Sequence, residues 1–127
     1  MLRYVVTAVV LSLPAATRAQ DAAAGQKVLN QCRSCHLVGP TAKSGVGREL
    51  NGLFGRTSGT VAGFNYSDAN KNSGITWGEA VFAEYIRNPK AKIPATKMAF
   101  AGLKDDKQIA DLTASLKQFD ADGKTAP

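Results

Sequence analysis

Apolar positions recur with a helical period near both ends of the chain. Residues 22–31 consist largely of good helix formers and follow Asp21, a residue type that caps helix N-termini. Close to the C-terminus, Asp105 is followed three residues later by Gln108, which predicts the start of a last helix. The apolar face of this last helix comprises Ile109, Leu112, Leu116 and Phe119.

A third helix is predicted in the second half of the chain. Thr76-x-x-Glu79 has the form of a capping box, and we expect the helix that it opens to run through Ile86 and to stop before Pro89. Residues 37–65 hold seven of the 12 glycines and show no strand-like alternation, so we expect loop there. The polar tail from Asp120 to Pro127 is expected to fray. The pattern predicts an all-α fold of three main helices and long loops.

Loops of this length are unusual in a compact domain. A large cofactor around which the loops wrap would explain them, because it would supply the apolar surface that such a small chain lacks. We therefore expect a small helical domain built around one bound group.

The N-terminus reads as an export signal. Arg3 precedes an almost wholly apolar stretch over residues 4–16, and Ala19 offers a small residue at the cleavage position. Pro14 interrupts this stretch, which is also shorter than the about 20 residues that span a bilayer. We predict a cleaved signal peptide over residues 1–19, a single domain over residues 20–127, and a periplasmic location.

The net charge points to an acidic protein partner. The full chain carries +6, and cleavage after Ala19 would remove Arg3 and Arg18 and leave +4. A basic chain could bind nucleic acid, but its lysines are scattered singly and form no basic run. We therefore expect no nucleic-acid binding.

Candidate chemistry is concentrated in Cys32-Arg33-Ser34-Cys35-His36, which holds both cysteines and the single histidine. This Cys-x-x-Cys-His pattern is typical of covalent attachment of a c-type haem, with two thioether bonds and the histidine as an iron ligand. A structural zinc site needs four ligands, and no further Cys or His remains. A thioredoxin-like pair would need a βαβ context that is missing here, and a simple disulfide would leave His36 unexplained.

The haem motif supplies one axial ligand of the iron, and the sequence alone does not decide which group is the second. With one histidine in the chain, bis-histidine ligation within one molecule is excluded, whereas a lysine, water or an open site is compatible with the sequence. Met98 is a natural candidate, since it is the only methionine after the predicted cleavage site and a thioether raises the reduction potential. Met98 could equally fill a gap in the core.

Beyond these residues, the chain resembles the class I cytochromes c, in particular the mitochondrial type and the short bacterial cytochromes c2. The resemblance runs from about Gly25 to Phe119. It is carried by the haem motif and by four further segments: Asn51-Gly52-Leu53-Phe54-Gly55-Arg56, Gly63-Phe64-Asn65-Tyr66-Ser67-Asp68-Ala69-Asn70, Gly74-Ile75-Thr76-Trp77 and Ile93-Pro94-Ala95-Thr96-Lys97-Met98.

The resemblance implies one haem c attached through Cys32 and Cys35, with His36 and Met98 as iron ligands. It also implies a soluble, monomeric one-electron carrier rather than an enzyme. Such a carrier shuttles between membrane complexes, a bc-type complex and a terminal oxidase or reaction centre, and touches their acidic docking surfaces transiently. An alternative is a peroxidase-like or small-ligand-binding haem protein in which Met98 has dissociated.

Further roles follow from the same resemblance. Arg56, Tyr66 and Trp77 correspond to the residues that hold the haem propionates, and buried carboxylates need such donors. Asn70, Tyr85 and Thr96 correspond to the polar network on the methionine side of the haem. The lysines expected to surround the exposed haem edge and to steer acidic partners are Lys43, Lys90, Lys97 and Lys104.

Four positions depart from the family pattern. Arg48 replaces a proline whose carbonyl accepts a hydrogen bond from the proximal histidine, a bond that an arginine carbonyl still accepts. Ala95 replaces a glycine and would strain the methionine loop if this position needs a positive φ. Leu29 and Ser115 replace aromatic residues between the first and last helices, which predicts weaker docking of these helices.

Overall fold

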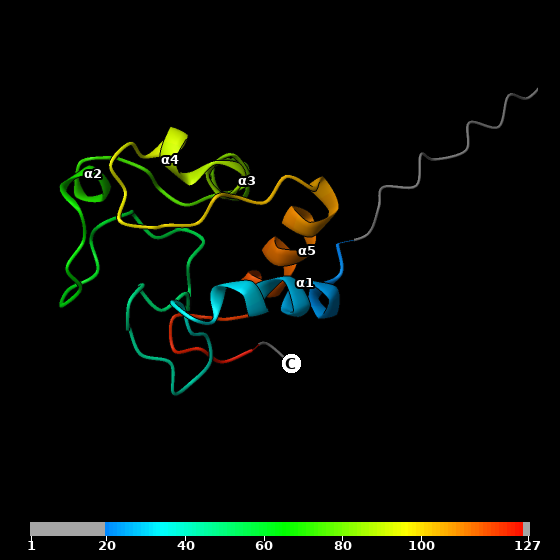
Figure 1. The fold of residues 1–127 in the computed structure, drawn as a ribbon. Coiled ribbons are helices and arrows are strands. Elements are labelled where there is room, and N and C mark those ends of the chain that lie inside the picture. The colour runs from blue at the N-terminus through cyan, green and yellow to red at the C-terminus, as the bar shows by residue number, and fades with distance from the viewer. Residues whose placement is uncertain (1–19, 126–127) are drawn as a thin grey trace, which may run out of the picture.

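A computed structural model describes residues 20–125 and contains helices and loops but no strand within that range (Figure 1). The predicted all-α class is confirmed. The predicted signal peptide and the last two residues lie outside the described residues. No helix between residues 20 and 125 is long and apolar enough to cross a membrane. The helical segments are α1 (Ala22–Leu29), the 3-10 helix η1 (Asn30–Cys32), α2 (Asp68–Lys71), α3 (Glu79–Arg87), α4 (Pro89–Lys92) and α5 (Asp106–Lys117).

The first and last helices begin as the sequence predicts. The Asp21 carboxylate accepts hydrogen bonds from the backbone N–H groups of Ala23 and Ala24, and the Asp105 carboxylate accepts one from that of Gln108. These side chains satisfy amide groups that have no partner inside the helix. α1 continues through η1 directly into Cys32, so a helix end positions the haem motif.

The predicted capping box of α3 is wrong. The N-cap is Gly78, without a side-chain hydrogen bond, and Thr76 instead pairs its backbone with Thr57 in an isolated antiparallel bridge. The hydrogen bonds of this bridge come from the neighbours of Thr76: the N–H of Trp77 donates to the carbonyl of Arg56, and the N–H of Ser58 donates to that of Ile75. Trp77 is thus engaged outside the helix, which begins two positions later than a Thr76 cap would require. α3 ends at Arg87, before Pro89 as expected.

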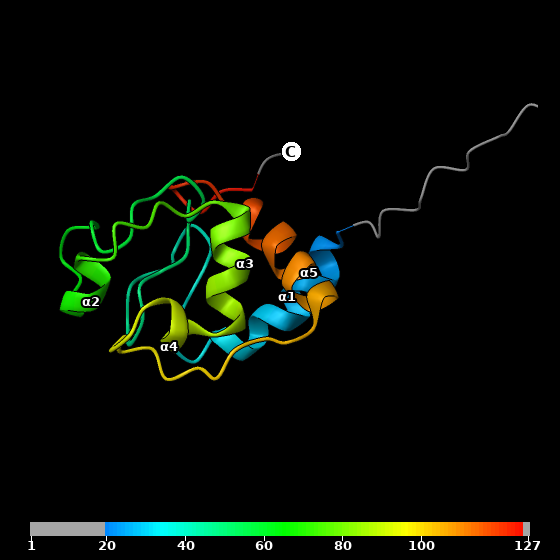
Figure 2. The ribbon, with the colours of Figure 1, turned by 90° about the horizontal axis from the view of Figure 1, so that it is seen from above.

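α1 and α5 lie side by side although they come from opposite ends of the sequence (Figures 1 and 2). They approach closely because Gly25 has no side chain: a Cβ built there would lie 1.8 Å from the carbonyl oxygen of Asp111 and 2.8 Å from the Cβ of Ser115. Asp111 also accepts a 2.9 Å hydrogen bond from the backbone N–H of Asp21. The predicted weaker docking through Leu29 and Ser115 remains a prediction, but both residues are fully buried.

Two four-residue helices interrupt the stretches between the main helices, and the sequence analysis did not predict them. Ser67 caps α2 through its hydroxyl, and Asn88 caps α4 through its side-chain oxygen, with Pro89 in the first turn. α2 lies at the other end of the molecule from the paired α1 and α5, whereas α3 packs next to α5 (Figure 2). Loop segments run between α2 and α3.

The C-terminal tail differs from the predicted frayed segment. Asp120 accepts hydrogen bonds from the backbone N–H groups of Asp122 and Lys124, both at 2.9 Å, and Phe119 pairs with Thr125 in an isolated bridge. An Asp side chain that closes its own turn in this way fixes the backbone locally. Residues 119–125 consequently form a closed turn.

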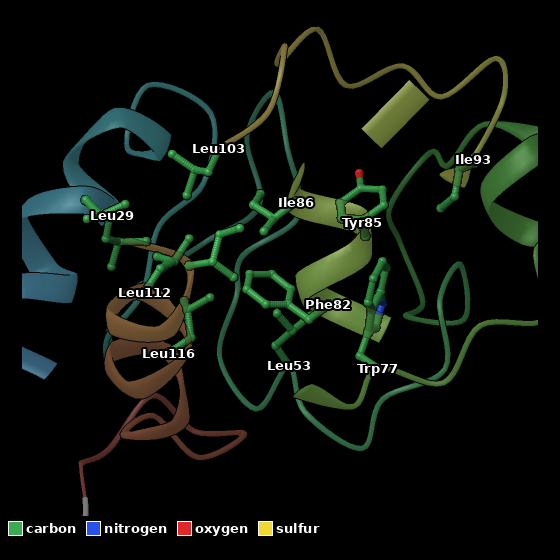
Figure 3. Close-up of a cluster of buried hydrophobic side chains, with 12 residues drawn as sticks. Leu29, Leu53, Trp77, Phe82, Tyr85, Ile86, Ile93, Leu103, Leu112 and Leu116 are labelled. Carbon is green, nitrogen blue, oxygen red and sulfur yellow. The ribbon is translucent and has the colours of Figure 1, made fainter. Parts of the chain in front are cut away.

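One cluster of buried apolar side chains joins the three main helices (Figure 3). Trp77 and Tyr85 meet edge to face with ring centroids 4.9 Å apart, and Phe82 meets Phe54 in the same way at 5.5 Å. The cluster comprises Val28, Leu29, Leu53, Trp77, Phe82, Tyr85, Ile86, Ile93, Leu103, Ile109, Leu112 and Leu116.

Candidate functional site

Much of this core faces a hollow. Two adjoining cavities share seven lining residues, and they hold free volumes of about 760 and 1130 Å³, open mouths included. We call them together the central hollow. Its walls come from the loops and from α1, η1, α2, α3 and α5. The ten residues that the sequence analysis selected all line it: Cys32, Cys35, His36, Arg56, Tyr66, Asn70, Trp77, Tyr85, Thr96 and Met98.

The haem motif forms one tight turn at the edge of the hollow. The backbone N–H groups of Cys35 and His36 donate to the carbonyl of Cys32 at 3.1 and 2.8 Å, which places both cysteines and the histidine along one side of the turn. Both thiols are free, so the structure does not contain the alternative disulfide. Burial, and secondarily the neighbouring Cys35, raises the pKa of the Cys32 thiol.

His36 is held from two sides. Its Nδ1 lies 2.6 Å from the carbonyl oxygen of Arg48, to which a protonated Nδ1 donates. This confirms that arginine retains the hydrogen bond expected at this position. Gly47 packs against the ring, and a Cβ there would lie 2.4 Å from Cε1 of His36, so only glycine allows this approach. With Nδ1 engaged, Nε2 keeps a lone pair for a metal.

Met98 lies on the half-buried rim of both cavities, where two polar side chains position it. The Tyr85 hydroxyl donates to Sδ of Met98 at 3.0 Å, and the backbone N–H of Met98 donates to Oγ1 of Thr96 at 3.3 Å. Burial raises the pKa of Tyr85, against the opposing effect of a hydrogen bond with Thr96. The phenol therefore keeps the proton that it donates to sulfur.

Ala95 has a φ of +64° and is the only non-glycine residue with a positive φ in the described range. We expected Ala95 to strain the methionine loop if its position needs a positive φ, and the position does need one. Alanine pays a steric penalty in left-handed backbone, because its Cβ approaches the following carbonyl oxygen. The strained residue lies three positions before Met98, in the same loop.

Arg56, Tyr66, Asn70 and Trp77 approach the hollow from separate elements. Arg56 donates to the backbone carbonyls of Asn51 and Glu49, both at 3.3 Å. Burial lowers the pKa of Arg56, and the nearby Glu49 carboxylate opposes this effect. Tyr66 packs edge to face on Phe64, while Asn70 belongs to α2. Their roles toward a haem remain predictions.

The four lysines expected around the exposed edge are all exposed, but they differ in position. Lys97 lines the hollow and donates to the carbonyl of Asn65 at 3.3 Å. Lys104 donates to the carbonyl of Arg87, at the end of α3. The other three, Lys43, Lys90 and Lys104, do not line the hollow. The steering role of the four remains a prediction.

Two residues next to the site, Gly47 and Glu49, were not predicted from the sequence. Gly47 was counted only as a loop glycine, although its contact with His36 makes it necessary. Glu49 was not considered, yet this buried carboxylate pairs with Arg48 and approaches Arg56. The available indication was that Glu49 is the only acidic residue in residues 37–65 and directly follows Arg48.

The residues of the hollow fit a covalently attached haem. Two free thiols lie beside an imidazole whose Nε2 is available, and the Met98 thioether reaches both cavities. The buried Nε of Arg48 has no hydrogen-bond partner among the described residues, and it suits an anionic group of a ligand. No group of three or more His, Cys, Asp or Glu side chains could hold a bare metal ion in the described part of the chain.

Comparisons with known proteins agree with this geometry. The profile of the cytochrome c family matches residues 22–120. Cytochrome c2 from Blastochloris viridis is 68% identical over 105 residues, which is 83% of either chain. Cytochrome c-550 from Bradyrhizobium diazoefficiens is 61% identical over 103 residues, 81% of this chain and 76% of that protein. The structure of cytochrome cH from Methylobacterium extorquens superimposes with a TM-score of 0.72 at 43% identity and covers 76% of this chain and 97% of its own.

Proposed function

Because the chain belongs to the cytochrome c family, we propose that it carries single electrons on one haem c that lies in the central hollow, with His36 and Met98 as axial ligands. The electron-carrier function and the covalent haem c follow from family membership. The attachment through Cys32 and Cys35 and the choice of ligands are the proposed part.

One observation carries this proposal: Cys32, His36 and Met98 line both cavities of the hollow, and Cys35 lines one of them. Residues far apart in the sequence thus converge where a flat macrocycle would need two thioether attachments and two axial ligands. The iron supplies the one-electron change between ferric and ferrous states. The protein holds both ligands in place from its own backbone and side chains, through Arg48 on the histidine side and Tyr85 and Thr96 on the methionine side.

Polar side chains at the hollow are proposed to complete the site. Arg56, Tyr66 and Trp77 would hold the haem propionates, because a buried carboxylate requires charged or hydrogen-bonding donors. Asn70, Tyr85 and Thr96 would tune the methionine side, since groups that orient a ligand also set its donor strength.

We place the mature carrier in the periplasm, with acidic docking surfaces of membrane complexes as its partners. The predicted signal peptide and the positive net charge support this placement. A bc-type complex would be the electron donor, and a terminal oxidase or reaction centre the acceptor. The alternative of an open iron site draws support only from the strained Ala95, whereas Tyr85 holds the Met98 sulfur inside the hollow.

The test is an absorption spectrum and redox titration of the mature protein, together with Met98→Ala and Cys35→Ser variants. We expect a near-infrared sulfur-to-iron charge-transfer band at neutral pH and a single one-electron transition. Met98→Ala should abolish the band and lower the potential, because the thioether favours ferrous iron. Cys35→Ser should leave one thioether.

A wild-type protein without the band at neutral pH would favour the open-site alternative. A Met98→Ala protein that keeps the band would exclude Met98 as the ligand. Lys117→Gln is a suitable control, because Lys117 lies in an exposed ion pair with Glu79 and does not line the hollow.

A further inference from the structure

A buried ion cluster borders the histidine side of the central hollow. The carboxylate of Glu49 lies 2.5 Å from the terminal NH2 nitrogen of Arg48 and 3.8 Å from NH1 of Arg56. Its other oxygen accepts a 2.7 Å hydrogen bond from the backbone N–H of Asn51. Glu49 is 8% exposed, so this carboxylate is removed from bulk water and both of its oxygens are engaged.

The guanidinium of Arg48 is anchored but not fully satisfied. NH1 donates to the Ser44 hydroxyl and NH2 pairs with Glu49, which fixes the plane of the group. Nε is buried and finds no acceptor anywhere in residues 20–125. A buried donor that lacks an acceptor is costly, and an arginine held in one orientation cannot turn Nε toward solvent. An additional acceptor from outside the protein chain is therefore needed.

The position of Arg48 indicates where this acceptor comes from. Arg48 lines both cavities of the hollow, and Arg56 lines one of them. Two guanidinium groups share one carboxylate, so the cluster keeps one uncompensated positive charge beside a space that is otherwise mostly apolar. Such a charge favours an anionic group, and a planar guanidinium suits a carboxylate.

We propose that Arg48 donates through Nε–H to a carboxylate side chain of the haem, and that Glu49 positions the Arg48 guanidinium for this contact. The inference rests on the proposed function, since it requires the haem in the hollow. It adds a second arginine to Arg56 at the propionates. Arg48 would thus support the haem twice, by its carbonyl on His36 and by its side chain on the carboxylate.

NMR spectroscopy of the ferrous, diamagnetic protein tests the contact directly. We expect a slowly exchanging arginine Nε–H signal that disappears in Arg48→Lys and shows a nuclear Overhauser effect to the methylene protons of a haem carboxylate side chain. In Glu49→Gln, the same proton should exchange with solvent at least tenfold faster. A missing Overhauser effect overturns the contact, and an unchanged exchange rate in Glu49→Gln overturns the role of Glu49.

The reduction potential provides a second readout that packing alone would not move. Arg48→Gln removes a positive charge near the iron, so the ferric state should be favoured by about three- to tenfold, equivalent to at most about 59 mV for one electron. Lys117→Gln removes the same charge from an exposed ion pair that does not line the hollow and should change the equilibrium less than about twofold. Equal potentials of Arg48→Gln and the wild type overturn the proposal.

These outcomes are separable from failure of the proposed function. A wild-type protein that attaches no haem, or that lacks the sulfur-to-iron band, contradicts the proposed function itself. An intact haem spectrum with no Arg48 contact and no shift in potential contradicts only the role of Arg48 and Glu49. Lys117→Gln, which does not line the hollow, should keep both the haem spectrum and the potential of the wild type within these limits.

Discussion

At the scale of single residues, Ala95 combines backbone strain with closeness to Met98, the proposed iron ligand. A left-handed φ costs a residue with a Cβ about 1–2 kcal/mol relative to glycine. The strain lies in the loop that carries Thr96 and Met98, where a small displacement moves the sulfur. Tyr85 and Thr96 counteract this displacement through hydrogen bonds.

Ala95→Gly should therefore strengthen Met98 ligation. Relief of the strain is partly offset by the greater freedom of glycine in the unfolded chain. We therefore expect the free energy of unfolding to rise by about 1 kcal/mol or less. The measurement is the denaturant concentration at which the sulfur-to-iron band is lost, which should rise. As a control, Ala99→Gly alters a nearby residue with an ordinary φ and should not raise the midpoint.

We expect Tyr85 to affect the donor strength of Met98, the proposed ligand, as well as its position. A hydroxyl that donates to Sδ withdraws electron density from the sulfur and makes it a weaker donor to ferric iron. Tyr85→Phe should thus lower the reduction potential, by less than a tenfold change in the equilibrium constant, or about 59 mV. A potentiometric titration measures the shift, and a rise in potential would contradict the inferred hydrogen bond.

At the scale of elements, the contact between α1 and α5 depends on small residues. Gly25 and Ser115 allow the backbones to approach, but the Ser115 hydroxyl is buried and has no partner in the described part of the chain. A buried hydroxyl without a hydrogen bond destabilises the folded state.

Ser115→Ala should stabilise the protein by about 1 kcal/mol, because it removes the unsatisfied hydroxyl and introduces a better helix former. The free energy of unfolding from denaturant titration measures this. Thr113→Val is the matched control, since the Thr113 hydroxyl donates to the Ile109 carbonyl at 2.8 Å and its loss should bring no such gain. Destabilisation by Ser115→Ala would mean that the hydroxyl has a partner that is not described.

The sequence predicts elements well where the determinant is local. The caps at Asp21 and Asp105 and the spacing of the haem motif act within one helical turn, so they could be read directly. The capping box predicted at Thr76 is wrong because a segment distant in sequence, around Thr57, pairs with the backbone on either side of Thr76. Gly47 and Glu49 escaped prediction for the same reason: their importance arises only when their loop folds against His36 and Arg56.

At the scale of the whole molecule, most ion pairs of the described residues lie at the surface. Several ion pairs, such as Lys92–Glu84 and Arg87–Asp106, have exposed members and contribute little to stability. The positive excess therefore matters mainly for how the protein approaches a partner. Lys97, at the rim of the hollow, is the lysine best placed to act in this way.

Electron transfer to an acidic partner should slow severalfold as ionic strength rises from about 0.01 to 0.1 M, because the Debye length falls from about 30 to 10 Å. Second-order rate constants from stopped-flow mixing measure this dependence. Lys97→Gln should flatten the salt dependence, whereas Lys117→Gln should keep it. Rates indifferent to salt would contradict electrostatic steering.

The pairing of the first and last helices has a consequence for biosynthesis. Leu112 and Leu116 of α5 form part of the wall of the hollow, and the Asp111 carboxylate holds the backbone at Asp21. The cysteines, by contrast, lie close to the N-terminus and are synthesised early. A chain cut short before Asp105 would present both thiols but lack one wall of the hollow. The cofactor site therefore has all of its walls only after the last helix has been synthesised.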